Sequence, residues 1–175
     1  MKNDLRIHKL KKKQQSMESN FNVLKERVVE LSESNVWWSA KNEWVMCGYE
    51  EDEECEGVCT CGKHGLRHLY TILNVNNNNR LEFIGSKCIL QFDNPKMKEE
   101  VKICEEWNNR VIKRGKFKGM SFAEISRLNA AENYVEWLER KIEDDPDWNI
   151  QLGRFFKPFI QYYNLKTRLE ANNYL

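Results

Sequence analysis

Residues 55–63 read Cys-Glu-Gly-Val-Cys-Thr-Cys-Gly-Lys, which places three cysteines within seven residues, and another follows at Cys88. Between them, residues 68–75 alternate in a way that is typical of a β-strand, and residues 80–84 predict a returning strand. Four consecutive asparagines, 76–79, join the two strands, because asparagine tolerates the positive φ angles of a tight turn. A helix is expected over 87–92, so the hairpin brings Cys88 back toward the first three cysteines.

Cysteines that cluster in this way indicate a metal site rather than disulfides in an intracellular protein. A structural zinc ion takes four thiolate or imidazole ligands in a tetrahedron, with sulfur at about 2.3 Å. The start of the following helix also favours a thiolate at Cys88 through its dipole. The order of cysteine turn, hairpin and helix is that of a treble-clef-like zinc module. We therefore predict one Zn²⁺ with four ligands, namely Cys55, Cys59, Cys61 and Cys88.

The spacing departs from the common pattern, because Cys-x-Cys stands where Cys-x2-Cys is usual. The fourth ligand is therefore open among four residues: Cys55, Cys47, His64 and His68. A catalytic zinc would need an open coordination position and a neighbouring carboxylate base. Glu54 and Glu56 lie in the acidic run 50–56, which is typical of a solvated loop, so we expect a structural zinc.

The overall composition excludes several classes of protein. The chain has 175 residues, enough for one ordinary domain or two small ones, and its hydrophobic fraction of 41% is sufficient for a packed core. Its net charge of only +1 does not by itself indicate a polyanionic partner. No run approaches the roughly 20 apolar residues of a membrane span, and no apolar segment follows the first lysines as in a secretory signal. Composition therefore predicts an intracellular protein without a membrane segment.

The N-terminal part predicts one long amphipathic helix, because residues 5–34 contain neither glycine nor proline. Its apolar positions form a stripe with a/d-like spacing, interrupted by Gln14: Leu10, Met17, Phe21, Leu24, Val28 and Leu31. A short coiled coil that makes a homodimer is one interpretation. The alternatives are a helix that packs on its own domain and a frayed basic arm before residue 16.

The chain therefore divides into three segments, and its predicted fold class is α+β. A small treble-clef-like zinc module with a β-hairpin occupies 35–95. It is flanked by the long helix or coiled coil of 1–34 and by a mainly helical region over 96–175. Residues 36–48 predict a strand-rich start of the middle segment.

The helical region carries clear start signals. Ser121 and Glu124 predict a capping box, and Pro146 stands at a first-turn position. Cys104 falls on an apolar helical face and is expected to be a core thiol. A further helix, broken or kinked by Pro158, has an apolar stripe that predicts core: Trp148, Leu152, Phe155, Phe156, Phe159, Ile160 and Tyr163.

Four basic residues surround Gly115 and Gly119 just before the capping box: Lys113, Arg114, Lys116 and Lys118. Glycine lets backbone N–H groups approach a ligand closely, and the helix start attracts an anion. One interpretation is a phosphate site for nucleic acid, in which Phe117 stacks on a base. In the other interpretation, Phe117 anchors a solvated loop to the core. The basic side chains of this loop then pair with nearby acids: Glu105, Glu106 or Glu124.

Two segments resemble known families. The first comprises Cys59-Thr-Cys61-Gly62-Lys63, then Leu66, Tyr70, Ile72 and Asn74, then Ile84-Gly85-Ser86-Lys87-Cys88-Ile89 and Phe92. It resembles uncharacterised zinc-binding segments of large DNA viruses, phages and some bacteria, which share Cys-x-Cys-Gly-Lys/His and Gly-Ser/Asn-x-Cys. Members often carry a Cys or His at the position of Tyr70, so the resemblance implies that Cys55 or His68 replaces that ligand.

The second resemblance covers residues 115–138. Here Gly-Lys-Phe-Lys-Gly at 115–119 and Tyr-Val-Glu-Trp-Leu at 134–138 resemble a Gly-Lys-Tyr-Lys-Gly…Tyr-x-x-Trp-Leu module. That module is appended to some DNA exonucleases of the exonuclease X type and occurs alone in small phage and viral proteins. Together the resemblances imply a protein of a large DNA virus or mobile element, located in the host cytoplasm or nucleus or in the virion.

No catalytic pattern accompanies these segments. The sequence has no Gly-x-x-x-x-Gly-Lys-Ser/Thr loop, no Gly-x-Ser-x-Gly elbow and no His-Glu-x-x-His helix. We therefore expect a non-catalytic zinc-binding protein that takes part in replication, repair or transcription, with DNA or RNA and other proteins as partners. The alternative is a protein–protein adaptor or inhibitor that acts through its zinc module and helical surfaces, and the near-neutral net charge favours it.

Overall fold

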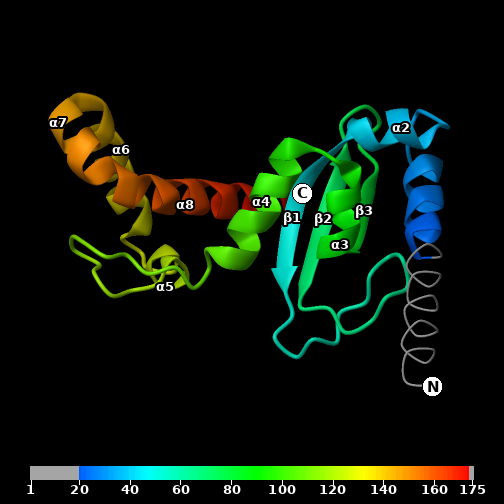
Figure 1. The fold of residues 1–175 in the computed structure, drawn as a ribbon, viewed down its shortest axis with the longest axis horizontal. Coiled ribbons are helices and arrows are strands. Elements are labelled where there is room, and N and C mark those ends of the chain that lie inside the picture. The colour runs from blue at the N-terminus through cyan, green and yellow to red at the C-terminus, as the bar shows by residue number, and fades with distance from the viewer. Residues whose placement is uncertain (1–19, 174–175) are drawn as a thin grey trace, which may run out of the picture. The chain divides into compact units, whose positions relative to one another are not determined.

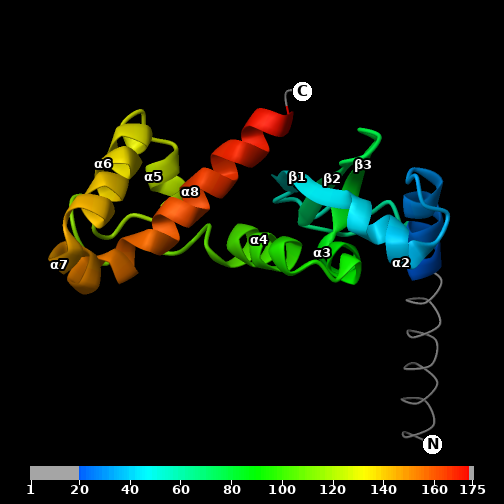
Figure 2. The same cartoon turned by 90° about the horizontal axis from the view of Figure 1, so that it is seen from above.

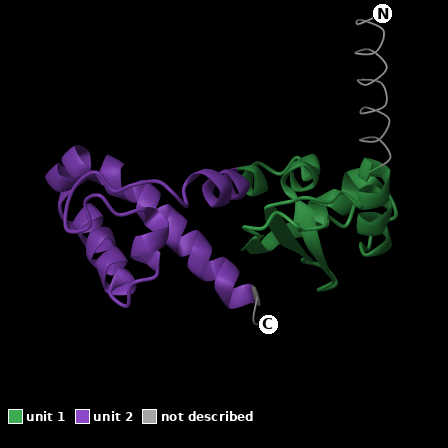
Figure 3. Cartoon of the chain, turned by 90° about the horizontal axis from the view of Figure 1, so that it is seen from below, with its two compact units in different colours: residues 1–98 green, residues 99–175 purple. Residues whose placement is uncertain are grey.

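The computed structural model describes residues 20–173 of the chain, leaving 1–19 and 174–175 outside the described residues (Figure 1). It divides into two compact units, Met1–Lys98 and Glu99–Leu175 (Figure 3). Part of the expected N-terminal helix lies outside the described residues. This part contains the stripe positions Leu10 and Met17 and the basic arm before residue 16.

The centre of the first unit is a three-stranded antiparallel sheet with the order β1-β2-β3 (Figure 1). Its strands are β1 (Trp44–Glu51), β2 (His68–Asn74) and β3 (Arg80–Gly85). The predicted hairpin of β2 and β3 is thus confirmed, and Asn78 takes a φ of 61° in its turn. Tyr70 of β2 pairs with Ile84 of β3, and both are fully buried.

Short helical segments follow the hairpin. Helix α3 (Ser86–Ile89) begins directly after β3 and continues into a 3-10 turn (Leu90–Phe92). Helix α4 (Pro95–Glu106) comes next. Ile89 and Phe92 are both buried, so the helix expected over 87–92 is present and contributes to the core of the first unit. Sheet and helices together confirm the α+β class.

The segment 36–48 does not start as a strand, which corrects the expectation. Helix α2 (Trp37–Ala40) and a 3-10 turn (Lys41–Glu43) precede β1. Trp37 and Ala40 are buried while Trp38 is exposed, so the apolar positions here follow a helical spacing rather than strand alternation. The carbonyl of Val36 accepts hydrogen bonds from the N–H groups of Ser39 and Ala40 and starts the turn.

Residues 20–30 are helical, and this helix packs within the first unit. Leu24 and Val28 are 0% exposed, and the ring of Phe21 lies 5.5 Å from that of Trp37 in an edge-on contact. The carbonyl of Leu31 accepts hydrogen bonds from two asparagine side chains of the hairpin turn, Asn77 and Asn79. The described part of the apolar stripe is therefore covered by the chain's own residues. This agrees with the alternative of a helix that packs on its own domain, and dimerisation stays a prediction.

The second unit is helical. Its helices after α4 are α5 (Phe122–Ser126), α6 (Ala131–Asp144), α7 (Pro146–Trp148) and α8 (Arg154–Asn173), with a π-helical turn (Asn149–Gly153) before α8. Figure 2 shows α5, α6 and α8 side by side. In the part of the chain that is described, no helix is both long and apolar enough to span a membrane.

Local signals in the second unit act largely as expected. The capping box is confirmed: the Ser121 hydroxyl accepts from the Glu124 N–H, and the Glu124 carboxylate accepts from the Ser121 N–H. Pro158 does not break α8, which runs through it. Phe156 and Phe159 are buried core residues, and Cys104 is buried too, which raises the pKa of its thiol to about 12.

Candidate functional site

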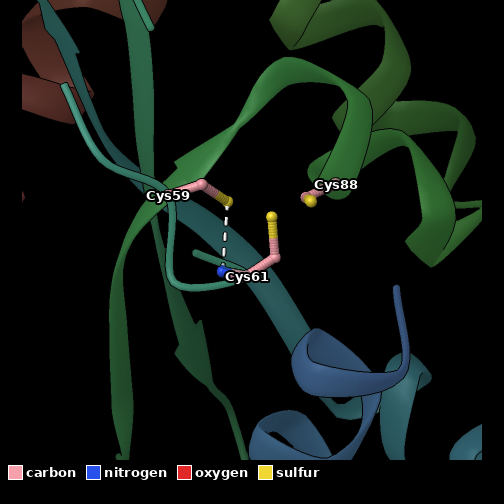
Figure 4. A group of neighbouring side chains, drawn as sticks. All are labelled: Cys59, Cys61 and Cys88. Carbon is pink, nitrogen blue, oxygen red and sulfur yellow. Dashed lines mark hydrogen bonds between the residues drawn. The ribbon is translucent and has the colours of Figure 1, made fainter. Parts of the chain in front are cut away.

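Three cysteines of the first unit form the cysteine cluster, defined as Cys59, Cys61 and Cys88 (Figure 4). Their sulfur atoms all lie within 4.8 Å of one another. A tetrahedral zinc with bonds of about 2.3 Å separates its sulfur ligands by about 3.8 Å. The sulfur–sulfur separations therefore need to shorten by at most about 1 Å for the thiols to share one ion, and the cluster can hold a metal.

The loop between β1 and β2 supplies two of these thiols from one tight turn. The Cys59 N–H donates to the carbonyl of Lys63, and the Gly62 N–H donates back to the carbonyl of Cys59. Gly62 takes a φ of +83°, which L side chains rarely adopt, so glycine permits this turn. The turn points both sulfur atoms toward Cys88 (Figure 4).

The end of β3 brings the third thiol to the same place. Gly85 is the last residue of β3, and Cys88 follows within α3. A Cβ on Gly85 would lie 2.6 Å from Cδ1 of Leu66 and 3.8 Å from Sγ of Cys59. A side chain at position 85 would therefore force the Leu66 side chain to move, whereas it would meet Sγ of Cys59 only at ordinary van der Waals distance.

Backbone N–H groups make the cluster a suitable place for thiolates. Sγ of Cys59 accepts hydrogen bonds from the N–H groups of Cys61 (3.5 Å) and Gly85 (3.3 Å). A hydrogen bond from the Cys88 thiol and these N–H groups lower the pKa of Cys59 to about 5, although burial opposes them. The same bond raises the pKa of Cys88, and burial raises that of Cys61. The expected dipole of the following helix contributes little, because α3 has only four residues.

The structure does not bring the predicted ligand Cys55 into the cluster. Its side chain is exposed, and its thiol donates to the carbonyl of Glu53 at 3.8 Å. The reason is local: the Asp52 carboxylate accepts hydrogen bonds from the N–H groups of Glu54 and Glu56, both at 3.0 Å. These bonds, with the one from the Cys55 N–H to the Asp52 carbonyl, close the acidic loop on itself.

Of the other candidate ligands, only His68 borders the cysteine cluster. Cys47 is buried in β1 and His64 is exposed, and neither lines the cavity of about 230 Å³ that the three cysteines border. His68, the first residue of β2, does line it. Its Nδ1 shares a hydrogen bond of 2.8 Å with the hydroxyl of Tyr49. Nε2 is therefore the ring nitrogen that remains to coordinate a metal.

The four predicted nucleic-acid ligands lie in the basic loop, which comprises Lys113, Arg114, Lys116 and Lys118 within residues 112–120. Backbone hydrogen bonds of Ile112 with Gly119 and Met120 close this loop. Among the residues that the structure describes, none of its four charged groups makes an ion pair. The expected pairing with nearby acids is therefore absent from the described residues. Arg114 and Lys116 lie instead over the rings of Phe155 (4.9 Å) and Phe117 (5.2 Å), contacts that do not neutralise their charges.

Two details of the basic loop refine the expectation. The ring of Phe117 lies edge-on against Tyr134 at 4.7 Å, so it anchors the loop, as in the second interpretation. The N-terminus of α5 is occupied by its own capping box, and the Glu124 carboxylate lies there. The Glu124 carboxylate opposes the expected attraction of an anion to this helix start, since it already places a negative charge there.

The cavity beside the basic loop was not expected. It has a volume of about 580 Å³ and lies between Arg114 and Lys116 on one side and aromatic residues of α6, α7 and α8 on the other. Trp148 and Phe156, both from the predicted core stripe, line it: Phe156 is buried as predicted, and Trp148 is half-buried. No single periodicity reveals such a cavity, because its walls come from three helices.

No protein-family model, curated protein or solved structure matches this chain. The geometry of the two sites therefore carries the functional argument.

Proposed function

We propose that this protein is a non-catalytic, zinc-stabilised protein that binds nucleic acid. The observation that carries the proposal is the convergence of Cys59, Cys61 and Cys88 from a cysteine turn and from the helix after a hairpin. This order supports a treble-clef-like module. Sulfur-rich sites with two buried thiols are typical of structural zinc, whereas catalytic zinc keeps a position open for water.

His68 is the best candidate for the fourth ligand. Its Nε2 would coordinate the metal if the hydrogen-bonded His68–Tyr49 pair moved toward the thiols, and Tyr49 on Nδ1 would then orient the ring. Such an outer partner for a ligating histidine is common in metal sites. Cys55 would instead have to break the hydrogen bonds that close the acidic loop around Asp52.

Nucleic acid is the partner that the basic loop supports best. Its four cations have no ion pair among the described residues, and phosphate contacts by lysine and arginine dominate the affinity of nucleic-acid complexes. We further propose that the protein takes part in replication, repair or transcription in a large DNA virus or mobile element. This part of the proposal rests on the resemblances of the two segments.

The zinc half of the proposal is tested by elemental analysis of purified, unstripped protein, which should contain one zinc per chain. Cys88→Ser should lose the metal and lower the melting temperature, because the binding free energy of a structural zinc is also folding free energy. Cys104→Ser is the matched control, since Cys104 is a buried thiol outside the cluster. Full-length protein without zinc would refute this half.

The nucleic-acid half is tested by fluorescence anisotropy over a range of salt concentrations. The double variant Lys116→Ala, Lys118→Ala should bind all sequences more weakly and flatten the salt slope by about two. Lys63→Ala together with Lys87→Ala removes the same charge from the first unit and should leave the slope unchanged. An unaltered slope in the basic-loop variant would refute the assignment.

A protein–protein adaptor is the second candidate, because the net charge of only +1 does not favour a polyanionic partner. Contiguous apolar patches mark contact sites whereas single exposed apolar side chains are common, so Ile150, which is 77% exposed, serves as the probe of this candidate. A pull-down from nuclease-treated extract separates the candidates: a partner that is lost with Ile150→Asp but retained with the basic-loop variant favours the adaptor.

A further inference from the structure

The cavity of the second unit combines aromatic rings with positive charge. Its volume of about 580 Å³ is within the range of small-ligand pockets. Its lining includes four aromatic side chains and two cations: Tyr134, Trp137, Trp148, Phe156, Arg114 and Lys116. No carboxylate is among the described residues that line it. The cavity therefore suits a ligand that is planar and carries negative charge.

The aromatic rings form two stacked pairs that meet at nearly a right angle. Tyr134 and Trp137 are 13° from parallel, with centroids 6.0 Å apart, and Trp148 and Phe156 are 14° from parallel at 5.5 Å. Trp137 and Trp148 meet at 82°. Trp137 is 43% exposed, so its indole offers apolar surface to a planar group.

Tyr134 supplies a polar group that has no partner. The residue is only 8% exposed, and its hydroxyl has no hydrogen-bond partner among the described residues. A buried hydroxyl without a partner is costly, and such groups in native proteins need an explanation. Burial also raises the pKa of Tyr134, so the hydroxyl keeps its proton and remains a donor at neutral pH. A ligand with a hydrogen-bond acceptor would satisfy it after a small movement of the neighbouring Gly115, because the hydroxyl oxygen is fully buried.

We propose that this cavity takes an unstacked base of single-stranded nucleic acid. Trp137 stacks on the base, Tyr134 donates a hydrogen bond to its edge, and Arg114 and Lys116 contact the flanking phosphates. This inference rests on the proposed function and names the form of nucleic acid. The two cations disfavour a methylated amine, the other common ligand of aromatic cavities, because like charges repel. Duplex DNA keeps its bases stacked and so cannot fill the cavity.

The test measures the affinity of the full chain by fluorescence anisotropy at low salt, with three probes of equal length. These are a labelled oligothymidine of about 15 nucleotides, an abasic strand and a blunt duplex. Oligothymidine should bind most tightly. Trp137→Ala should weaken its binding about tenfold, as expected for one stacked base, and leave the abasic strand unaffected. Trp38→Ala is the matched control, because Trp38 is 71% exposed but lies in the first unit, and it should change nothing.

Tyr134→Phe keeps the ring and removes only the hydroxyl. Because that hydroxyl has no partner in the free protein, the variant should melt at an equal or higher temperature and yet bind oligothymidine more weakly. Equal affinity for oligothymidine and the abasic strand, or unchanged affinity in both variants, would overturn the inference and leave the proposed nucleic-acid function standing. Failure of all three probes to bind would overturn both.

Discussion

The carboxylate of Glu43 accepts a hydrogen bond from the side-chain amide of Asn74 at 2.7 Å, and both residues are buried. The same carboxylate accepts hydrogen bonds from the backbone N–H groups of Glu33 (2.8 Å) and Ser34 (2.9 Å). One side chain thus joins the end of the N-terminal helical segment to the hairpin of the first unit.

Replacement of Glu43 should destabilise the first unit. Glu43→Gln puts an amide N–H₂ group where the carboxylate accepts from three donors, so at least one buried donor loses its partner. We expect a loss of about 2 kcal/mol in the free energy of unfolding, measured by denaturant titration. Glu54→Gln, in the exposed acidic loop, is the control and should have no effect; equal stability of the two variants would contradict the role of Glu43.

The same carboxylate should make stability depend on pH. Burial raises the pKa of Glu43, but the hydrogen bonds from Asn74, Glu33 and Ser34 together lower it by more than burial raises it. The pKa of Glu43 therefore lies below its ordinary value of 4.5. A group with a depressed pKa in the folded state stabilises the protein above its unfolded pKa, and the stabilisation is lost as the pH falls through the folded pKa. The free energy of unfolding should therefore fall more steeply below about pH 4.5 in the unmodified protein than in Glu43→Gln. Parallel curves would contradict this expectation.

Leu24 tests what the N-terminal helix does. Since Leu24 is 0% exposed within a single chain, Leu24→Ala should cost about 2 to 5 kcal/mol in the free energy of unfolding. The neighbouring Val23 is 45% exposed and serves as the control, because Val23→Ala removes apolar surface without opening a cavity. Light scattering on the same variants separates the interpretations: if Leu24→Ala abolished a dimer without lowering stability, the coiled coil would be favoured.

Features that depend on local chemistry could be predicted from the sequence. The hairpin follows from strand alternation and a turn of asparagines, and the start of α5 follows from the spacing of Ser121 and Glu124. The approach of Cys59 and Cys61 to Cys88 follows from the hairpin between them. In each case neighbouring residues, or one short connection, determine the geometry.

Features that depend on tertiary packing could not be predicted in this way. Cys55 has the right residue type and spacing for a ligand, but the hydrogen bonds of Asp52 hold its loop away from the cluster. An apolar position such as Leu24 looks the same in the sequence whether it packs on its own domain or on a second copy of the helix, because both require an apolar residue on one helix face. Trp148 and Phe156 fit a core stripe equally well, and only the placement of α6 and the basic loop makes them cavity walls.

The choice between His68 and Cys55 as the fourth zinc ligand can be decided by metal substitution. Co²⁺ reports its ligands through its absorption spectrum, so a site with three thiolates and one imidazole differs from one with four thiolates. We expect Cys55→Ser to leave the spectrum and the metal stoichiometry unchanged, since Cys55 is exposed and outside the cluster. His68→Ala should change the spectrum and weaken zinc binding. Tyr49→Phe, which removes the hydrogen bond to Nδ1, should keep the spectrum and lower zinc affinity by about 10- to 100-fold, as is typical of outer partners. Loss of the metal in Cys55→Ser, with full binding in His68→Ala, would instead establish four cysteine ligands and show that the acidic loop refolds around the ion.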